Sequence, residues 1–243
     1  MELIERARRI VVLSGAGVST DSGIPDFRGP NGLWTRDPGA ERMSNITEYR
    51  RDPALRARTW QARTVNPAWT AKPNAAHRAL ARLEETGRLV AILTQNIDGL
   101  HQRAGSRRVI ELHGTMFETV CLSCPDVRPM REALDRVRAG EVDPPCLVCG
   151  GILKSATVSF GQALDRAVLD EARAAAESAD LMLAVGSSLT VQPAAGLVGL
   201  AARAGAPVVI CNASPTPYDG LAVAVVREPL SEALPALLAA PTA

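Results

Sequence analysis

The amino-acid sequence predicts an α/β protein, with helices on both faces of a Rossmann-like parallel sheet and a smaller module made of a zinc ribbon and a helical insert. Short apolar runs alternate with helix-like segments along most of the chain, a pattern typical of βα units around a parallel sheet. Two segments interrupt this alternation. Residues 33–73 are rich in Arg, Trp and Pro and contain no strand-like run, and residues 119–153 contain two CxxC pairs.

The predicted strands are short apolar runs, long enough for a buried parallel strand and too short for a helix. They are Ile10–Leu13, Leu89–Thr94, Val109–Leu112, Leu181–Val185, Val208–Cys211 and Ala222–Val226. The clearest helix begins after Asn74, a good N-cap residue, and ends at Gly87. The predicted domains are a Rossmann-like domain of residues 1–32, 84–118 and 154–243, a helical insert of residues 33–83 and a zinc-binding module of residues 119–153.

Length, composition and charge restrict the classes of protein. A chain of 243 residues, of which 47% are hydrophobic, is long enough for one large domain with a small insert. The formal net charge of +1 gives no general attraction to nucleic acid or to an anionic membrane. Residues 1–9 lack the apolar core of a secretory signal, and no apolar run reaches the length of a membrane span. We therefore expect a cytoplasmic protein.

A glycine-rich stretch follows the first predicted strand and reads SGAGVSTDSGIPDFRGPNG at residues 14–32. Gly15 and Gly17 let the backbone turn sharply and approach a ligand. A helix starting near Val18 would direct its free N–H groups at a pyrophosphate. The stretch therefore predicts a phosphate-binding turn, and we interpret Ile24–Gly29 as a lid that carries chemistry.

The same stretch disfavours a hydride-transferring dehydrogenase. Thr20 stands where the dinucleotide fingerprint has its third glycine. Glu41 has roughly the offset of the ribose-binding acid, but it lies in no predicted strand. A redox enzyme on a Rossmann-like fold therefore stays only as an alternative.

A second polar loop, Gln95–Asp98, follows the predicted strand Leu89–Thr94. Ligands of open α/β sheets bind at the carboxyl ends of strands, so this loop and the glycine turn share one crevice if their strands are neighbours. Gln95, Asn96 and Asp98 offer amide and carboxylate groups that suit a carboxamide and ribose hydroxyls. The alternative is an Asn/Asp turn that caps the next helix.

The chain has three histidines, which keeps the list of candidate bases short. His113 follows Val109–Leu112 and precedes Gly114, so we predict it at the carboxyl end of a core strand. This position makes His113 the leading candidate for a general base. We interpret His77 as structural, and His101 as structural or as a support for residues that contact the ligand.

Four of the five cysteines form two CxxC pairs separated by 21 residues. They are Cys121, Cys124, Cys146 and Cys149. This spacing predicts a structural zinc site with four thiolate ligands, which leaves no open position for a catalytic water. Disulfides fit poorly with a chain expected to be cytoplasmic. Cys211, in an apolar run, is interpreted as a small buried hydrophobe.

The motifs GAGVSTDSGIPDFRGPNGLW, TQNIDGLH, the His-Gly pair after the next strand, the CxxC pairs and VGSSL at residues 185–189 together closely resemble the sirtuins. Sirtuins are NAD-consuming protein-lysine deacylases, and the resemblance spans about residues 5–238. It implies a Rossmann-like domain with a zinc and helical module, NAD as co-substrate and one structural zinc. The implied partners are acyl-lysine proteins or peptides, with no nucleic acid, no membrane and no particular oligomeric state.

The resemblance also assigns roles to the residues that match the family's motifs. His113, Asn96 and Asp98 are implied to be catalytic, with His113 as the base. The implied NAD-binding residues are Gly15, Ala16, Gly17, Thr20, Phe27, Arg28, Gln95, Asn96, Ile97, Asp98, Gly186, Ser187, Ser188 and Asn212. The implied substrate residues are Val158, Phe160 and Gly161.

In the implied reaction, nicotinamide leaves the ribose carbon and the acyl oxygen of the lysine amide takes its place, which gives an O-alkylimidate. His113 then deprotonates a ribose hydroxyl, which attacks the imidate carbon. Water completes the reaction and gives free lysine and O-acyl-ADP-ribose. Acetyl is the expected acyl group, and ADP-ribose transfer to protein is an alternative on the same scaffold.

Two departures from the family pattern concern the substrate. Residues 154–162, KSATVSFGQ, replace the family form K/R-P-D/N-x-V-F-F-G-E, with Ser155, Ala156, Ser159 and Gln162 at the changed positions. Members that favour succinyl or malonyl lysine carry Tyr-x-x-Arg, and residues 60–63 read Trp60-Gln61-Ala62-Arg63. Arg63 would then meet a distal carboxylate, which makes a desuccinylase or demalonylase an alternative. In the other interpretation Trp60 anchors the insert and Arg63 is solvated.

A zinc ribbon that binds nucleic acid is a further alternative, from another class of protein. Such a module would need a basic face with stacking aromatic side chains. Residues 119–153 instead mix acidic and basic residues, so this alternative is weak.

Overall fold

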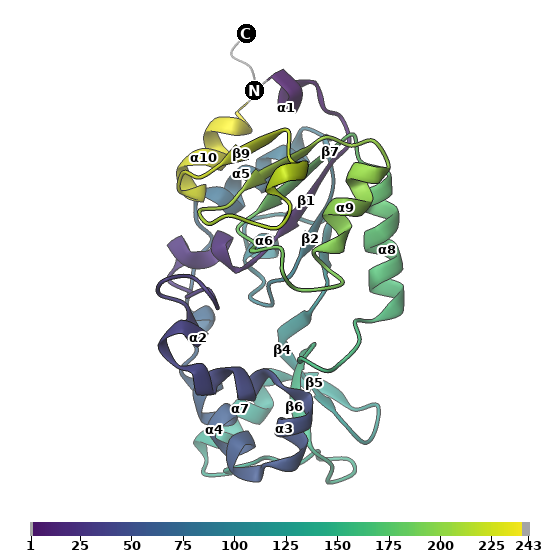
Figure 1. Ribbon diagram of the computed structural model, residues 1–243. Helices are drawn as coiled ribbons and strands as arrows, with labels where there is room; N and C mark the ends of the chain where they lie inside the picture. Colours follow the sequence, from purple (N-terminus) through teal and green to yellow (C-terminus); the bar gives the residue numbers. More distant parts are fainter. Residues whose placement is uncertain (1, 240–243) are drawn as a thin grey trace. The chain divides into compact units, whose positions relative to one another are not determined.

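The computed structural model describes residues 2–239, whose contacts divide into two units (Figure 1). Unit 1 comprises Met1–Asp26, Ala71–Leu112 and Asp165–Ala243. Unit 2 comprises Phe27–Thr70 and His113–Leu164. Each unit has its own sheet and its own buried apolar cluster.

Unit 1 contains a six-stranded parallel sheet in the order β3-β2-β1-β7-β8-β9, which confirms the predicted α/β fold. The strands are β1 (Ile10–Ser14), β2 (Leu89–Thr94), β3 (Val109–Glu111), β7 (Leu181–Val185), β8 (Val208–Cys211) and β9 (Ala224–Val226). All residues of β1, β7 and β8 are buried, as expected for apolar strands covered on both faces. Three strands differ from the prediction. The strand β1 ends one residue later than expected, at Ser14, and β3 ends one residue earlier, at Glu111. The strand β3 lies at the sheet edge and is only partly buried, and β9 begins two residues later than expected.

Helices cover both faces of this sheet (Figure 1). They are α5 (Ala75–Glu85) with α10 (Leu230–Leu237) on one side, and α8 (Arg166–Glu177) with α9 (Gly196–Arg203) on the other. The shorter elements are α1 (Glu2–Arg6), α6 (Leu100–Arg103) and two 3₁₀ helices, η1 (Ala16–Ser22) and η4 (Asp219–Leu221). Helix α5 begins as predicted, because the Asn74 side chain accepts the backbone N–H groups of Ala76 and His77.

Unit 2 combines an antiparallel sheet with short helices. The sheet has the order β5-β4-β6, formed by β4 (Gly114–Cys121), β5 (Val127–Pro129) and β6 (Leu153–Thr157). The helices are α2 (Leu33–Arg36), α3 (Ile46–Arg51), α4 (Pro53–Thr64) and α7 (Met130–Arg138), with the 3₁₀ helices η2 (Pro38–Ser44) and η3 (Pro67–Trp69). The Trp60 side chain is fully buried and packs with Met130 and Leu134 of α7 in the core of this unit.

The units differ from the predicted domain boundaries in three places. Residues 27–32, expected in the Rossmann-like domain, belong to unit 2. Helix α5, expected in the helical insert, buries Ala76, Leu80 and Leu83 in the core of unit 1. The segments 113–118 and 154–164, expected in the Rossmann-like domain, belong to unit 2 because β4 pairs with β6. Side-chain packing places α5 in unit 1, and strand pairing places the segments around β4 and β6 in unit 2.

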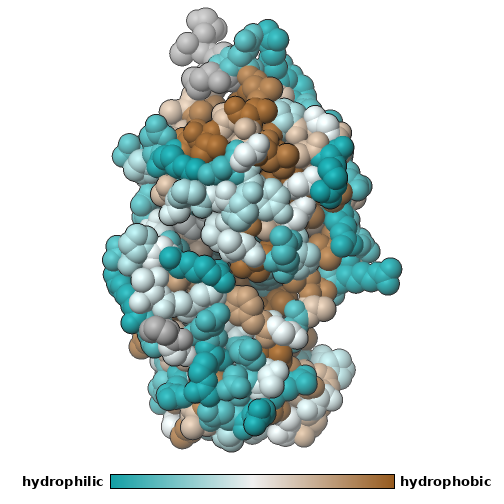
Figure 2. All heavy atoms as spheres, in the orientation of Figure 1, coloured by the Kyte–Doolittle hydropathy of each residue, from teal (hydrophilic) through white to brown (hydrophobic). Residues whose placement is uncertain are grey.

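The surface is polar in the view of Figure 2, in which hydrophilic residues surround smaller apolar groups. Within residues 2–239, none of the helices has both the length and the apolar character that a membrane crossing requires.

Candidate functional site

Three central strands of unit 1 end level with one another. Ser14 at the end of β1 is in register with Thr94 of β2 and with Val185 of β7. The sheet order also reverses at β1 and β7, because β2 and β3 lie on one side of this pair and β8 and β9 on the other. In open α/β sheets this switch point is where nucleotides bind.

The glycine turn after β1 packs against the loop after β7. Gly15 N–H donates to Val185 O at 3.0 Å, and Gly17 N–H donates to Gly186 O at 2.8 Å. A Cβ atom on Gly15 would lie 2.7 Å from Gly186 O, so only glycine fits there. The α-helix expected to start near Val18 is not present, because residues 16–22 form the 3₁₀ helix η1. The phosphate-binding interpretation therefore depends on the glycine turn and not on an α-helix dipole.

Polar side chains of the loop after β2 hold the same turn. Gln95 Nε2 donates to Ser187 Oγ at 2.9 Å. Asn96 Nδ2 donates to Gly15 O and to Ser19 Oγ, both at 3.2 Å. The predicted residues Gln95, Asn96 and Ser187 thus converge with the glycine turn at the carboxyl ends of the central strands.

Asp98 is 5% exposed, and both of its carboxylate oxygens have partners in the protein. Ser19 Oγ donates to Oδ2 at 2.7 Å, and Leu100 N–H donates to Oδ1 at 2.9 Å. Asp98 therefore forms an Asx turn into α6, close to the alternative interpretation of this loop, although the N-cap residue of the helix is Gly99. Ser19 was not predicted as a site residue, since a serine in a glycine-rich stretch carries no distinguishing signal.

The other predicted NAD-binding residues of unit 1 lie in the same loops or at the end of β8. Thr20 Oγ1 donates to Gly17 O at 3.0 Å, and Ser188 Oγ lies 2.9 Å from Thr190 Oγ1. Asn212 follows β8, and its side chain donates to Ser214 O at 2.8 Å. Ala16, Ile97 and Ser188 are partly buried, while Thr20 is exposed.

A buried hydroxyl–imidazole network lies beneath the loops. Ser14 Oγ donates to Thr94 Oγ1 at 2.9 Å and lies 2.9 Å from His101 Nε2. Thr94 Oγ1 accepts the N–H of Asn96 at 3.1 Å. The His77 ring is tilted against the His101 ring, with 5.0 Å between centroids, and both side chains are buried. Both rings therefore lie in the protein interior, in agreement with the structural interpretation.

Burial lowers the pKa of His101 to about 3 and that of His77 to about 4. For His101 the neighbouring His77 lowers the pKa further, and for His77 the Asp98 charge opposes the shift. Both rings are therefore neutral near pH 7. An unfolded histidine has a pKa near 6.5, so the unfolded chain binds more protons than the folded chain below that pH.

We expect the free energy of unfolding to be greatest above pH 6.5 and to fall between about pH 6.5 and 3, with the His77 contribution lost by about pH 4. Each histidine contributes a slope of up to about 1.4 kcal/mol per pH unit. Urea titrations of wild type and His77→Gln over this range measure the slope. The variant is expected to show the shallower pH dependence, and equal slopes would contradict this account.

His113 lies in unit 2, between β3 and β4, and is partly buried. Its carbonyl accepts the N–H of Val158 at 2.8 Å. Gly114 has φ +71°, and a Cβ there would lie 2.1 Å from Ala156 O. The backbone on both sides of the His113 side chain is therefore fixed by β6 and by Val158, the residue after it. We predicted that the strand before His113 lies in the core of the sheet. This strand is β3, and it lies at the sheet edge.

Phe27, Arg28 and Phe160 gather around Trp34 in unit 2. The Trp34 ring lies 4.8 Å from Phe27 and 5.5 Å from Phe160, measured between centroids. The Arg28 guanidinium lies 4.5 Å above the Trp34 ring. Trp34 was not predicted as a site residue. Gly161, next to Phe160, has φ +87°, a backbone conformation that glycine adopts readily.

Arg63 uses its guanidinium inside unit 2. The guanidinium lies 4.5 Å from the Trp60 ring centroid, donates to Tyr49 Oη at 3.2 Å and donates to Ser155 Oγ at 3.3 Å. Trp60 is fully buried, as expected for an anchor of the insert. Arg63 is only partly exposed, so the expectation that it is solvated is not met. Ser155, one of the departures from the family form, supplies an oxygen that a proline would lack.

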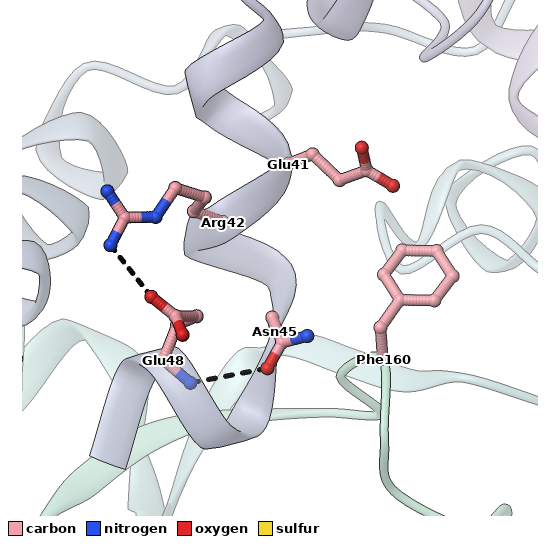
Figure 3. Close-up of a pocket in the computed structure, with 5 residues that line it drawn as sticks. All are labelled: Glu41, Arg42, Asn45, Glu48 and Phe160. Atoms are coloured by element: carbon pink, nitrogen blue, oxygen red, sulfur yellow. Dashed lines mark hydrogen bonds and ion pairs between the residues drawn. The ribbon is translucent and has the colours of Figure 1, made fainter. Parts of the chain in front are cut away.

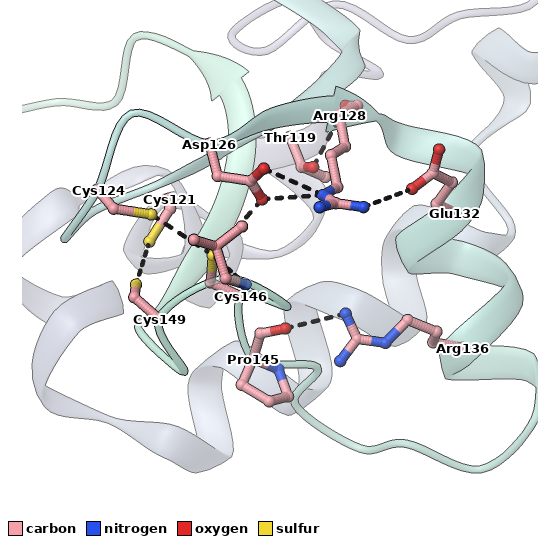
Figure 4. A network of polar contacts seen from close by, with 11 residues as sticks. Thr119, Cys121, Cys124, Asp126, Arg128, Glu132, Arg136, Pro145, Cys146 and Cys149 are labelled. Carbon is pink, nitrogen blue, oxygen red and sulfur yellow. Dashed lines mark hydrogen bonds and ion pairs between the residues drawn. The ribbon is translucent and has the colours of Figure 1, made fainter.

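The four predicted cysteines cluster in unit 2 (Figure 4). Their sulfur atoms all lie within 4.8 Å of one another, with 3.5 Å between Cys121 and Cys149 and 3.6 Å between Cys124 and Cys146. Zn–S bonds of about 2.3 Å in a tetrahedron place sulfurs about 3.8 Å apart, whereas a disulfide needs about 2 Å. The cluster therefore fits one tetrathiolate zinc ion.

Backbone groups support the same cluster. Ser123 N–H donates to Cys121 Sγ at 3.3 Å, and Val148 N–H donates to Cys146 Sγ at 3.4 Å. Such N–H···S bonds stabilise thiolate ligands. Cys211 lies in β8 and is fully buried, as predicted.

A parallel sheet with helices on both faces and a glycine turn at its switch point places unit 1 in the nucleotide-binding class of α/β folds. A profile of the Sir2 family matches residues 15–193. The chain belongs to the Sir2 family, and the predicted resemblance to sirtuins is confirmed.

Individual relatives cover nearly the whole chain. The sequence is 57% identical over 231 residues to NAD-dependent protein deacetylase 2 of Streptomyces coelicolor, across 94% of this chain and 96% of the relative. It is 43% identical over 222 residues to an NAD-dependent protein deacylase of Aeropyrum pernix, across 90% and 87% of the two chains.

Solved Sir2 structures have the same fold. A Sir2 complex with a p53 peptide and NAD⁺ has a TM-score of 0.88 and 36% identity, and the match covers 98% of this chain and 95% of the other. A Sir2 complex with a propionylated peptide has a TM-score of 0.87 and 35% identity, covering 98% and 94%.

Proposed function

We propose that this protein is an NAD-dependent protein-lysine deacylase that removes acetyl groups, with nicotinamide and O-acyl-ADP-ribose as the other products. The observation that carries the proposal is the convergence of Gln95, Asn96 and Ser187 with the glycine turn at the switch point of the sheet. The family membership and the names of the relatives support the same activity.

We assign NAD to the loops at the carboxyl ends of β1, β2, β7 and β8. The close approach of Gly15 to Gly186 leaves the turn without side chains, which suits a pyrophosphate. Asn96 and Asp98 are held by Ser19 and by the glycine turn, so the loop is preorganised for a carboxamide and ribose. Phe27 and Arg28 of unit 2 are assigned to the NAD site by their match to the family's motif.

Further residues of unit 2 have proposed roles. His113 is proposed as the general base that deprotonates a ribose hydroxyl. Val158 and Phe160 are proposed to hold the acyl-lysine peptide, which adds as a strand. The four cysteines are proposed to hold one zinc that supplies no chemistry and fixes the fold of unit 2.

Turnover of an acetyl-lysine peptide tests this function most simply. With NAD we expect deacetylated peptide and nicotinamide to appear in equal amounts, and without NAD neither should form. A rise in absorbance at the reduced-nicotinamide band would instead indicate a dehydrogenase. ADP-ribosylated protein in place of deacetylated peptide would indicate a transferase.

The contacts of Arg63 favour acetyl over acidic acyl groups. Its guanidinium is already stacked on Trp60 and bonded to Tyr49 and Ser155. We expect Arg63→Ala to lower the free energy of unfolding by about 1–2 kcal/mol and to leave the ratio of succinyl to acetyl turnover unchanged. Arg58→Ala, at an exposed position of α4, is the matched control. A selective loss of desuccinylation in Arg63→Ala alone would reinstate the acidic-acyl interpretation.

A further inference from the structure

A small pocket of unit 2 opens beside Phe160 (Figure 3). It has a volume of about 220 Å³ and is lined by Glu41 and Arg42 of η2, by Asn45 and Glu48, and by Phe160. Pockets that enclose a drug-sized ligand have about 300–1,000 Å³. The size therefore suits one amino-acid side chain and not a nucleotide.

The charges around this pocket leave one carboxylate uncompensated. Arg42 Nη2 lies 2.7 Å from Glu48 Oε2 and 4.0 Å from Asp52 Oδ2, so its positive charge is already shared between two acids. Within the part of the chain that the structure describes, Glu41 has no ion pair. In Figure 3 its side chain extends over the same opening as the Phe160 ring. The pocket therefore has an excess of negative charge.

The remaining lining groups define the shape of the ligand. The Phe160 side chain is 38% exposed and offers an aromatic face. Asn45 Oδ1 is occupied, because it accepts the N–H groups of Thr47 and Glu48. An aromatic face beside a free carboxylate suits a cation on an apolar stem, which is the chemistry of a lysine or arginine side chain.

The backbone fixes this pocket to the segment proposed to hold the substrate. Phe160 N–H donates to Ser44 O at 2.8 Å, and Ile46 N–H donates to Phe160 O at 3.0 Å. Phe160 and Asn45 thus form a parallel β-bridge. Since Asn45 joins η2 to α3, the bridge holds both helices beside Val158–Gly161. A peptide that runs along Val158–Gly161, as proposed above, therefore passes next to the pocket.

On the basis of the proposed deacylase function, we propose that the Glu41 pocket binds a basic side chain of the peptide substrate, at a position flanking the acyl-lysine. The acyl-lysine is uncharged, so it gains nothing from Glu41. A flanking lysine or arginine gains an ion pair with Glu41 and a cation–π contact with Phe160. The pocket would make this enzyme prefer acyl-lysines in basic sequences.

A positional peptide scan tests the pocket. One acetyl-lysine peptide with alanine flanks is compared with peptides that carry a single arginine or glutamate at each flanking position. We expect arginine at one position to raise kcat/KM about fivefold at low salt, with a smaller gain at high salt. Glu41→Gln should remove this gain, and Glu41→Lys should transfer it to glutamate at the same position.

The controls separate this inference from the proposed function. Glu118→Gln removes the same charge from an exposed position of β4 and should keep the preference for arginine. Turnover of the alanine-flanked peptide should be unchanged in Glu41→Gln. The pocket assignment alone would be overturned if turnover did not depend on the residues flanking the acetyl-lysine. It would also be overturned if the preference for arginine survived in Glu41→Gln. Failure of every peptide to react would overturn the proposed function instead.

Discussion

His113→Ala is expected to lower deacetylation by about 10²- to 10⁴-fold, the usual contribution of a positioned general acid or base. In the proposed reaction the imidazole acts after nicotinamide has left, when a ribose hydroxyl must lose its proton. Formation of deacetylated peptide should therefore fail while the first step survives. The measurement is peptide turnover beside the exchange of labelled nicotinamide into NAD in the presence of the acetyl-lysine peptide.

The backbone of His113 should not change in this variant. Its carbonyl bonds to Val158 N–H through main-chain atoms, and Gly114 keeps its turn. Zinc content and the thermal unfolding curve of His113→Ala should therefore match wild type. Turnover close to that of wild type would remove His113 from the mechanism.

Loss of the zinc ion is expected to unfold unit 2. The four sulfurs lie within 4.8 Å of one another, and Cys146 belongs to the apolar core that Trp60 and Leu134 form. Structural zinc contributes about 10–16 kcal/mol to the folding of isolated zinc-finger peptides, which is comparable to the whole stability of a domain. Cys149→Ser should therefore abolish zinc binding, lose the ordered structure of unit 2 and lose deacetylation.

Metal analysis, circular dichroism and turnover measure these three losses. Wild type should contain one zinc per chain. Cys211→Ala is the matched control, because Cys211 lies in β8 outside the cluster, and this variant should retain its zinc. A Cys149→Ser variant with one tightly bound zinc and an unchanged unfolding curve would contradict the assignment.

The sequence predicted the parallel sheet well because its central strands are buried on both faces. Leu89–Thr94, Leu181–Val185 and Val208–Cys211 have the predicted bounds, since a continuous apolar run marks the length of a strand covered on both faces. The strand before His113 was placed wrongly in the core because an edge strand and a central strand can carry the same residues. The sheet of unit 2 was not predicted, because short strands around a metal cluster lack a regular apolar period.

The site was predictable where residue types carry specific chemistry. The cysteine spacing led directly to the cluster that the structure shows. Gln95 and Asn96 were predicted as site residues because amide side chains stand out directly after an apolar strand. Ser14, Ser19 and Thr94 were missed, since small hydroxyl residues acquire their role only when neighbouring strands bring them together.

The product that carries the acetyl group tests the central claim most directly. The protein is incubated with NAD and an acetyl-lysine peptide, and the products are weighed by mass spectrometry. If the amide oxygen displaces nicotinamide, the acetyl group must appear on ADP-ribose in an amount equal to the deacetylated peptide. Free acetate formed while NAD stays intact would show ordinary hydrolysis and would contradict the account.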